Sequence, residues 1–393
     1  MKRTRKWIAA VSSLAVLALI LVACGSGGAS TSTSTSTSTS TKSETATPAP
    51  ANNQTAADLK EKFKGQTINL LTWEGYADPK FIKGFEDKYG VKVNSTYFGS
   101  SDELVAKLKA GGGGTYDIIS PSSDVASMLV QSNLIDPIDI SKISHYNELN
   151  EKLRNLSDVQ KDGKVYGLPF TWGPDYLIYD ADVVKEEPKS WGIFWDPQYK
   201  GKVSIWDDIS NLYLVGQLNG LDKTDPAALY NMTEDQLQTT KNKLVQLKPQ
   251  IRKYWATAGE LNDLFANKEV VLAVGWPLTV TEVNAKGRNL KATIPAEGAT
   301  GWIDRLMIVK GTKHRELADL YLDYISSPQA QALVAEVTNY SVANPNASGF
   351  MSKELQELTY VNDMDKMFTN LNFWQNVKDR GRYNEIWTEI KTN

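Results

Sequence analysis

Short apolar runs alternate with amphipathic segments along the first part of the folded chain, and this order most constrains the fold. Ile68–Leu71, Val91–Phe98 and Tyr116–Ser120 are predicted strands. Between them, Pro79–Tyr89 and Ser101–Ala110 carry apolar residues at helical spacing. A strand–helix–strand order predicts a mostly parallel sheet with right-handed crossovers, so we expect an α/β fold.

A second set of strands and helices follows further along the chain. Lys202–Trp206 and Val270–Val274 are predicted strands, and Ile209–Leu218 and Thr233–Leu247 are predicted helices. A chain of 393 residues is too long for one hydrophobic core. We therefore expect two α/β domains.

The later part of the chain contains shorter elements. Ala292–Pro295 and Met307–Val309 are predicted strands, and Thr300–Arg305 is expected to connect them. From His314 onward the pattern is mostly helical, with an interruption at Thr338–Pro345.

The N-terminal region differs in composition from the rest. Residues 1–23 combine a basic start with an apolar segment that is too short for a spanning helix, which predicts a signal peptide. The segment ends at Leu21-Val22-Ala23-Cys24, which resembles a bacterial lipobox. This resemblance implies cleavage before Cys24 and lipidation of its thiol; an ordinary signal peptide with an incidental cysteine is the alternative. Residues 24–57 are rich in Gly, Ser and Thr, which predicts a disordered tether.

Composition excludes several classes of function. The formal net charge is −3, which argues against a nucleic acid partner because phosphate binding needs a basic face. Cys24 is the sole cysteine, so an intramolecular disulfide is excluded. With His145 and His314 as the only histidines, the chain has little material for a metal centre or a Ser-His-Asp triad. We predict no cofactor and no metal site.

Aromatic residues and carboxylates recur near the ends of predicted strands, where open α/β sheets bind their ligands. The aromatic residues are Trp73, Tyr76, Trp172, Trp276 and Trp302, and the nearby acids are Glu74, Asp124, Asp175, Asp208 and Asp304. Aromatic faces attract a cation and carboxylates accept its protons, so this set predicts a site for an ammonium compound. Taken singly, each tryptophan has core packing as an alternative. For Asp208, helix capping is an equally good alternative.

Several motifs, in a fixed order along the chain, resemble those of ABC-transporter solute-binding proteins of the spermidine/putrescine branch. They are Leu71–Tyr76, Ser101–Lys109, Tyr116–Ser122, Leu168–Gly173, Asp196–Gly201, Ile294–Gly298 and Trp302–Asp304. The resemblance covers about Gln66 to Lys391. It implies a type II periplasmic-binding-protein fold, in which two α/β lobes joined by hinge strands close over a ligand. We expect residues 58–172 and 277–326 in lobe 1, and residues 173–276 and 327–393 in lobe 2.

The resemblance also implies roles for individual residues. Trp73 and Tyr76 match the family's first-loop aromatics, and Trp276 matches the aromatic after a hinge strand. Asp208 and Asp304 match two of its acids. The resemblance adds two further candidates, Ser122 in a loop and Tyr340 in a late segment.

Departures from the family pattern leave the ligand open. Gly75 stands where an acid is usual, although Glu74 is adjacent, and Asn211 and Thr279 stand where acids are often found. Each ammonium of a polyamine needs its own acceptors, because a buried unpaired charge is costly. A polyamine is therefore one expected ligand, and a monoamine, quaternary ammonium or amino-acid-like zwitterion is the other. Arg305 is a candidate carboxylate partner for a zwitterion, with a surface salt bridge as its alternative.

Together these observations predict a monomeric, lipid-anchored, extracytoplasmic receptor that delivers an amine to an ABC permease and its ATPase. The residues predicted to bind the ligand are Trp73, Glu74, Tyr76, Ser122, Asp124, Trp172, Asp175, Asp208, Trp276, Trp302, Asp304 and Tyr340, and Cys24 is the predicted lipidation site. A hydrolase using paired carboxylates, and a sensor or adhesion lipoprotein, are the alternative classes. No spacing identifies an acid/base pair, so we do not expect an enzyme.

Overall fold

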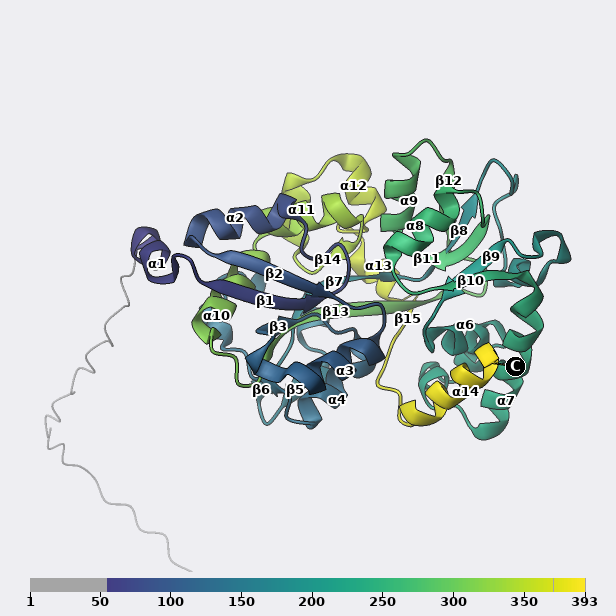
Figure 1. Ribbon diagram of the computed structural model, residues 1–393, viewed down its shortest axis with the longest axis horizontal. Helices are drawn as coiled ribbons and strands as arrows, with labels where there is room; N and C mark the ends of the chain where they lie inside the picture. The colour runs from purple at the N-terminus through teal and green to yellow at the C-terminus, as the bar shows by residue number, and fades with distance from the viewer. Residues whose placement is uncertain (1–54, 370, 393) are drawn as a thin grey trace, which may run out of the picture. The chain divides into compact units, whose positions relative to one another are not determined.

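The computed structural model describes residues 55–369 and 371–392, which form two large β-sheets flanked by helices (Figure 1). The strands are β1 (Thr67–Thr72), β2 (Lys92–Tyr97), β3 (Ile118–Ile119), β4 (Ile135–Asp136), β5 (Gln160–Lys161), β6 (Lys164–Val165), β7 (Leu168–Pro174), β8 (Tyr176–Asp180), β9 (Val203–Trp206), β10 (Ile251–Trp255), β11 (Leu272–Gly275), β12 (Leu290–Thr293), β13 (Ala299–Val309), β14 (Ser341–Val342) and β15 (Leu371–Phe373). The α-helices are α1 (Ala56–Phe63), α2 (Pro79–Tyr89), α3 (Ser101–Gly111), α4 (Ser123–Gln131), α5 (Glu151–Arg154), α6 (Ser210–Leu218), α7 (Glu234–Leu247), α8 (Ala258–Ala266), α9 (Pro277–Asn284), α10 (Arg315–Ile325), α11 (Pro328–Thr338), α12 (Lys353–Leu358), α13 (Met364–Phe368) and α14 (Arg380–Thr392).

Each sheet is the centre of one lobe, as predicted for a two-lobed α/β fold. The first sheet has the order β14-β7-β13-β3-β1-β2, and β4 and β15 also pair with β13. The second sheet has the order β10-β9-β11-β8-β12, while β5 and β6 pair with each other. The predicted parallel order is confirmed for β2, β1 and β3, and β10, β9 and β11 of the second sheet are also parallel. Both sheets are mixed, because β8 pairs antiparallel with β11 and β12, and β13 pairs antiparallel with β3, β4 and β7 but parallel with β15.

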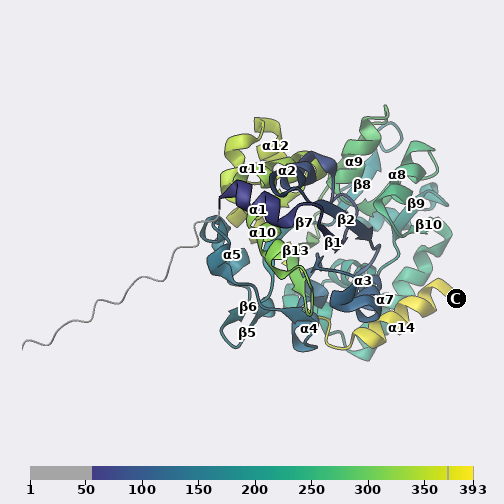
Figure 2. The ribbon, with the colours of Figure 1, turned by 60° about the vertical axis from the view of Figure 1, so that its left-hand side comes forward.

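The first lobe is a three-layer sandwich whose two hydrophobic cores follow from strand alternation. Successive side chains on a strand point to opposite faces of the sheet. Leu70 accordingly packs in one core with Phe85 of α2, and Leu71 packs in the other with Leu104 of α3 and Val125 of α4. The ribbon shows α2 and α3 on opposite faces of this sheet in both views (Figures 1 and 2).

The long strand β13 corrects one prediction. We expected Thr300–Arg305 to connect two predicted strands, Ala292–Pro295 and Met307–Val309. Instead, Ala299–Val309 is one continuous buried strand, paired with β7 from Gly301 to Leu306. Both charged side chains have hydrogen-bond partners inside the protein, so burial does not interrupt the strand.

Within the described residues, the chain passes between the two lobes three times. It crosses at Asp175 between β7 and β8, at residues 294–298 between β12 and β13, and at residues 374–379 between β15 and α14. Helix α14 then packs on α7 of the second lobe (Figure 2). The sheets therefore group β12 with the second lobe, and β14 and β15 with the first, which differs from the boundaries expected at residues 277 and 327. The sheet that each of these strands joins depends on pairing between segments far apart in sequence, and the local sequence pattern does not reveal such pairing.

The N-terminal predictions are only partly covered by the described residues. The proposed signal peptide, Cys24 and the tether up to residue 54 lie outside them. Helix α1 begins at Ala56, slightly earlier than the expected end of the tether at residue 57, because Thr55 and Asp58 form a reciprocal capping box. None of the helices in the described ranges is long and apolar enough to cross a membrane.

Candidate ligand-binding site

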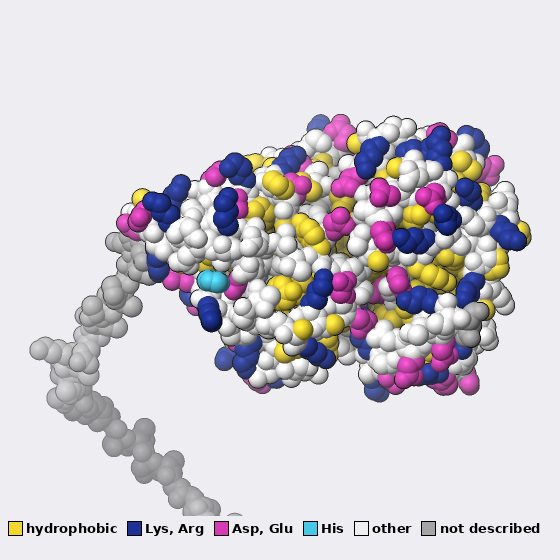
Figure 3. Space-filling model, in the orientation of Figure 1, with side chains coloured by type: hydrophobic (Ala, Val, Ile, Leu, Met, Phe, Trp, Pro, Cys, Tyr) yellow, Lys and Arg dark blue, Asp and Glu magenta, His cyan; other side chains and the backbone are white. Residues whose placement is uncertain are grey.

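A cavity of about 130 Å³ lies between the two lobes. The space-filling view shows a hollow there, with apolar side chains inside it and acidic side chains along it (Figure 3). The cavity is lined by Trp73, Glu74, Tyr76, Tyr97, Phe98, Gly99, Glu103, Ser122, Trp206, Trp255, Ala256, Thr257, Ala258, Trp276, Trp302, Asp304, Tyr340 and Trp374. Many of these residues end or directly follow the parallel strands β1, β2, β3, β9, β10 and β11, so the cavity lies where α/β sheets bind ligands.

Eight of the twelve residues predicted to bind the ligand line this cavity, and four do not. The eight are Trp73, Glu74, Tyr76, Ser122, Trp276, Trp302, Asp304 and Tyr340. The four that lie elsewhere are Asp124, Trp172, Asp175 and Asp208. None of the residues that line the cavity is Lys, Arg or His, so its charged side chains are all carboxylates.

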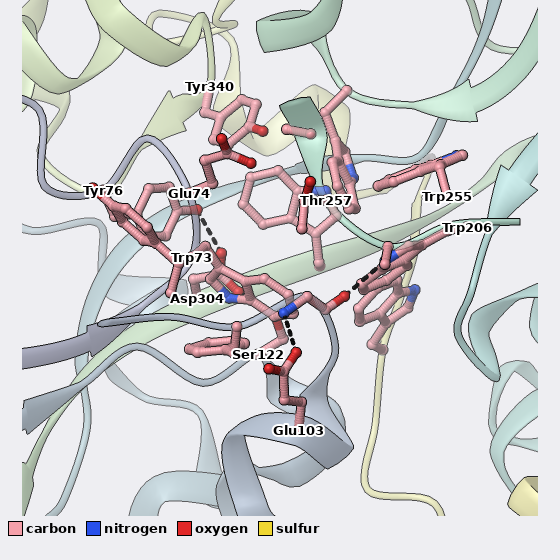
Figure 4. A pocket seen from close by; sticks show the side chains of 18 residues that line it. Trp73, Glu74, Tyr76, Glu103, Ser122, Trp206, Trp255, Thr257, Asp304 and Tyr340 are labelled. Atoms are coloured by element: carbon pink, nitrogen blue, oxygen red, sulfur yellow. Dashed lines mark hydrogen bonds between the residues drawn. The ribbon is translucent and has the colours of Figure 1, made fainter. Parts of the chain in front are cut away.

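Asp304 is the buried carboxylate of the cavity, with only 3% of its surface exposed. Its Oδ2 accepts a hydrogen bond from the Tyr76 hydroxyl at 2.5 Å, and its Oδ1 accepts one from the Ser122 hydroxyl (Figure 4). The Tyr76 hydroxyl also contacts Thr171 Oγ1 at 2.5 Å, which fixes its position. Burial raises the pKa of Asp304 to about 7, although the hydrogen bonds from Ser122 and Tyr76 lower it.

The neighbouring Arg305 does not reach the cavity. Its side chain is fully buried on the other side of β13, where it bonds to Asp158 at 2.8 Å and to the Ile303 carbonyl at 3.1 Å. Successive residues of a strand point to opposite faces, which explains why Asp304 faces the ligand site and Arg305 does not. Arg305 is therefore part of a buried ion pair, which differs from both roles considered from the sequence.

Indole rings form most of the remaining wall, and Trp206 lies at their centre. It stacks on Trp255 and Trp374, with ring centroids 5.8 and 6.1 Å away, and meets Trp276 and Trp73 edge-on at 5.0 and 5.8 Å. Clusters of this kind bind organic cations, because the ring faces carry negative potential.

Trp206, Trp255 and Trp374 were missed by sequence reasoning. Trp206 and Trp255 end the neighbouring strands β9 and β10. Trp206 ends a strand that the sequence did predict, so its position at a strand end could have identified it. Strand β10, which carries Trp255, was not predicted because its middle residues are polar and exposed. Trp374 comes from the end of the chain, and no local signal marks it.

Two carboxylates lie at the rim of the cavity. Glu74 is exposed, and its Oε2 accepts a hydrogen bond at 3.1 Å from Gly259 N, in the first turn of α8. Glu103 pairs with Lys107 at 2.8 Å and accepts a hydrogen bond from Gly99 N at 2.7 Å. Both are closer to solvent than Asp304, so they attract a cation less strongly.

Lobe-to-lobe hydrogen bonds close the cavity. Trp206 Nε1 of the second lobe donates to the Gly99 carbonyl of the first at 2.8 Å (Figure 4). The Glu74–Gly259 bond also joins the two lobes, and Asn339 donates to Thr281. The structure therefore represents a closed arrangement.

Asp124 is buried and belongs to an ion cluster outside the cavity lining. Arg380 of α14 bonds to its Oδ2 at 2.7 Å and to both oxygens of Asp102 at 2.9 Å. Asp124 also accepts a hydrogen bond from Ser101 at 3.0 Å. Its charge is thus compensated inside the protein.

Asp208 lies at the start of α6, where its Oδ1 accepts a hydrogen bond from Ser210 N at 2.8 Å. Asp208 precedes the N-cap residue, Ile209, and bonds to the first backbone N–H group of the helix, so it lies next to the capping position considered from the sequence. Burial raises the pKa of Asp208 to about 7, although the charge of Arg380 lowers it.

Trp172 and Asp175 lie behind the cavity. Trp172 is fully buried, packs on Phe368 at 4.7 Å and donates to the Val342 carbonyl at 3.3 Å, which is the core-packing alternative. Asp175 accepts a hydrogen bond at 3.3 Å from the indole of Trp276, which does line the cavity. Burial raises the pKa of Asp175 to about 7.

Comparison with known proteins identifies relatives over nearly the whole described chain. The chain is 27% identical to the putrescine-binding periplasmic protein PotF of Escherichia coli over 348 residues, covering 83% of this chain and 92% of the relative. It is 26% identical to the Escherichia coli spermidine/putrescine-binding periplasmic protein over 332 residues, covering 82% of this chain and 90% of the relative.

Solved structures have the same fold. A protein of Listeria monocytogenes matches with a TM-score of 0.74 and 27% identity, over 84% of this chain and 99% of that one. A Treponema pallidum lipoprotein matches in fold, with a TM-score of 0.70 and 22% identity, over 83% of this chain and 99% of that one. The family model for bacterial extracellular solute-binding proteins matches residues 80–361, which is more than half of the chain. Together with the two-lobed fold and the cavity between the lobes, this match means that the chain belongs to the bacterial extracellular solute-binding protein family.

Proposed function

We propose that this protein is the receptor of an ABC importer and that it captures an organic amine, as a cation, in the cavity between its lobes. The observation that carries this proposal is Asp304, a buried carboxylate within an aromatic wall that has no cationic side chain among its described lining residues. The two Escherichia coli relatives, named for putrescine and spermidine, support an amine ligand here.

An ammonium group would bind next to Asp304 and restore the charge balance of the site. A carboxylate can accept about four hydrogen bonds, and those from Tyr76 and Ser122 occupy two positions. The ligand would use the remaining positions, while its methylene or methyl groups would pack on the indole faces around Trp206. Because an uncompensated buried charge is costly, the cation stabilises the ionised carboxylate in the closed cavity.

Capture would occur by closure of the two lobes about the three crossings at Asp175, residues 294–298 and residues 374–379. We propose these crossings as the lobe boundaries and hinges. The ligand contacts Asp304 of the first lobe and Trp206 of the second, so it binds the closed form more tightly than the open form. That differential affinity shifts the population towards closure.

Polyamines such as putrescine and spermidine are the first candidates for the ligand. Each ammonium group needs an acceptor, and Asp304 at depth with Glu74 and Glu103 at the rim supplies acceptors for more than one.

A monoamine or quaternary ammonium compound is the second candidate. The several indole rings favour it, and so does the position of Asp124 and Asp208 outside the cavity lining. A zwitterion is less well suited, because none of the described lining residues offers its carboxylate a positive charge.

Thermal unfolding with a panel of ligands tests the proposal. The panel contains putrescine, spermidine, choline, betaine, γ-aminobutyrate and common amino acids. A ligand at one hundred times its dissociation constant should add about 2.7 kcal/mol to the free energy of unfolding. A polyamine shift supports the first candidate, and a shift with choline alone supports the second. Stabilisation only by anionic or uncharged solutes would overturn the amine assignment.

We further propose that the chain acts as a monomer anchored through Cys24 and serves a permease and an ATPase rather than acting as an enzyme. The lipobox-like Leu21–Cys24 segment supports the anchor. In a bacterial host, Cys24→Ser should move the protein from the membrane fraction to the soluble extracytoplasmic fraction. Equal membrane association of both forms would contradict the anchor.

A further inference from the structure

Asp175 lies where all three crossings between the lobes meet. It is the single residue between β7 and β8, and its backbone N–H donates to the Thr300 carbonyl at 2.9 Å. Thr300 is the second residue of β13, which begins where the second crossing ends. The adjacent Gly301 carbonyl accepts a hydrogen bond at 2.7 Å from Trp374 N, at the third crossing. Backbone hydrogen bonds thus join the three crossings within a few residues of Asp175.

The carboxylate of Asp175 joins the crossings to the wall of the cavity. Its Oδ2 accepts a hydrogen bond from Thr300 Oγ1 at 2.6 Å, and its Oδ1 accepts one from Trp276 Nε1 at 3.3 Å. Asp175 is only 5% exposed and does not line the cavity, whereas Trp276 does. One side chain therefore holds the second crossing with one oxygen and a ligand-facing indole with the other.

Trp276 occupies a key place in the aromatic wall. Its ring meets those of Trp206 and Trp255 edge-on, at centroid distances of 5.0 and 5.2 Å. A ligand that contacts this wall would fix the position of the Trp276 indole and, through its N–H, the position of the Asp175 carboxylate. Conversely, a rotation at the crossings would move Asp175 and the indole that is bonded to it.

We propose that Asp175 is a positioning residue that couples ligand binding to lobe closure, by holding the Trp276 indole and the second crossing with the same carboxylate. This inference rests on the proposed function, since it takes the cavity as the ligand site. It assigns Asp175 a role different from the direct ligand contact expected from the sequence.

Asp175→Asn is the informative substitution, because it keeps the size of the side chain. The amide can keep both hydrogen bonds, because the Thr300 hydroxyl can turn and accept from the new N–H group, but it removes the negative charge that strengthens both bonds. Asp208→Asn is the matched control. Asp208 is also a buried carboxylate outside the cavity lining, but its bond to Ser210 N lies within the second lobe.

Binding of putrescine and of choline is measured by calorimetry, and compaction by small-angle scattering. We expect Asp175→Asn to weaken binding of whichever probe the unmodified protein binds by about tenfold, because both hydrogen bonds lose the charge that strengthens them. We also expect it to reduce the ligand-induced compaction. Asp208→Asn should keep both within about threefold of the unmodified protein, even where it lowers stability. Equal losses in the two variants, or unchanged binding and compaction in Asp175→Asn, would overturn the proposal.

Hydrogen exchange without ligand separates this inference from the proposed function. Asp175→Asn should speed amide exchange at residues 294–301 and 374–379 and in the peptide that contains Trp276, and Asp208→Asn should not. If neither probe binds the unmodified protein, putrescine and choline are excluded as its ligands, and this exchange pattern still decides whether Asp175 joins the crossings to the wall.

Thr300→Val, which removes only the side-chain bond between Asp175 and the second crossing, replaces Asp175→Asn if that variant does not fold. It should give the same faster exchange at residues 294–301, and unchanged exchange there would contradict the coupling.

Discussion

Replacing Asp304 by asparagine tests the chemistry of the site most directly. The amide keeps the shape of the side chain, and the hydroxyls of Ser122 and Tyr76 can reorient, because a hydroxyl can donate or accept. What is lost is the negative charge opposite the ligand. We therefore expect the variant to fold and to bind cationic ligands weakly.

The size of the effect follows from the type of bond removed. A hydrogen bond to a charged partner contributes about 1.5–3 kcal/mol. The site is buried, and Glu74 and Glu103, the other carboxylates among the described lining residues, lie nearer to solvent, so we place Asp304→Asn at about 2–3 kcal/mol. This corresponds to a rise in the dissociation constant of about 30- to 150-fold.

The pH profile of binding makes this test specific. The ligand-free pKa of Asp304 is about 7, and a cation binds the ionised form. Affinity for choline or putrescine, whose charges do not change in this range, should be full above pH 7 and should fall about tenfold for each pH unit below it. Calorimetry at pH 8, 7, 6 and 5 measures this slope, and Asp304→Asn should remove it.

Asp208→Asn is the control for this slope. The pKa of Asp208 is also raised to about 7 by burial, but Asp208 does not line the cavity, so its replacement should leave the slope intact. A flat profile for the unmodified protein, together with an Asp304→Asn affinity within about threefold of it, would refute the assignment of Asp304 as the cation acceptor.

Three further predictions concern closure and stability. A Cβ at Gly99 would lie 2.3 Å from the Ala256 carbonyl oxygen of the opposite lobe, so Gly99→Ala should block closure. Scattering should then show no compaction with ligand, while the urea midpoint stays within about 10% of its value; normal compaction would contradict the contact. Arg380→Met removes the cation paired with buried Asp124 and should lower the free energy of unfolding by about 3–5 kcal/mol, measured by urea titration against an exposed-lysine variant. An unchanged midpoint would contradict this. Finally, the three buried aspartates with a pKa of about 7 bind more protons in the folded than in the unfolded chain between about pH 4 and 7, so ligand-free stability should fall from pH 5.5 to 7.5; a rise would contradict it.

The sequence predicted the site best where position follows from strand order. Trp73 and Ser122 follow the parallel strands β1 and β3, and Trp276 follows β11, so the rule that ligands bind at carboxyl ends of strands placed them in one cavity. Trp374 could not be found in this way. It reaches the cavity because β15 pairs with β13, and that pairing joins segments about 70 residues apart in sequence, which no local pattern encodes.

The number of acids at strand ends is a poor guide to the charge of the ligand. Asp124 is paired with Arg380, which lies 256 residues later in the chain, and Asp175 is bonded to donors at the crossings. Asp208 is bonded at the start of a helix. Of the four buried aspartates that the sequence marked, Asp304 alone lines the cavity. A ligand cation compensates only carboxylates that it can reach, so the acids left unpaired in the folded cavity determine how many ammonium groups are bound. Long-range pairing therefore decides which acids remain available to a ligand in the cavity, and that cannot be counted from the sequence.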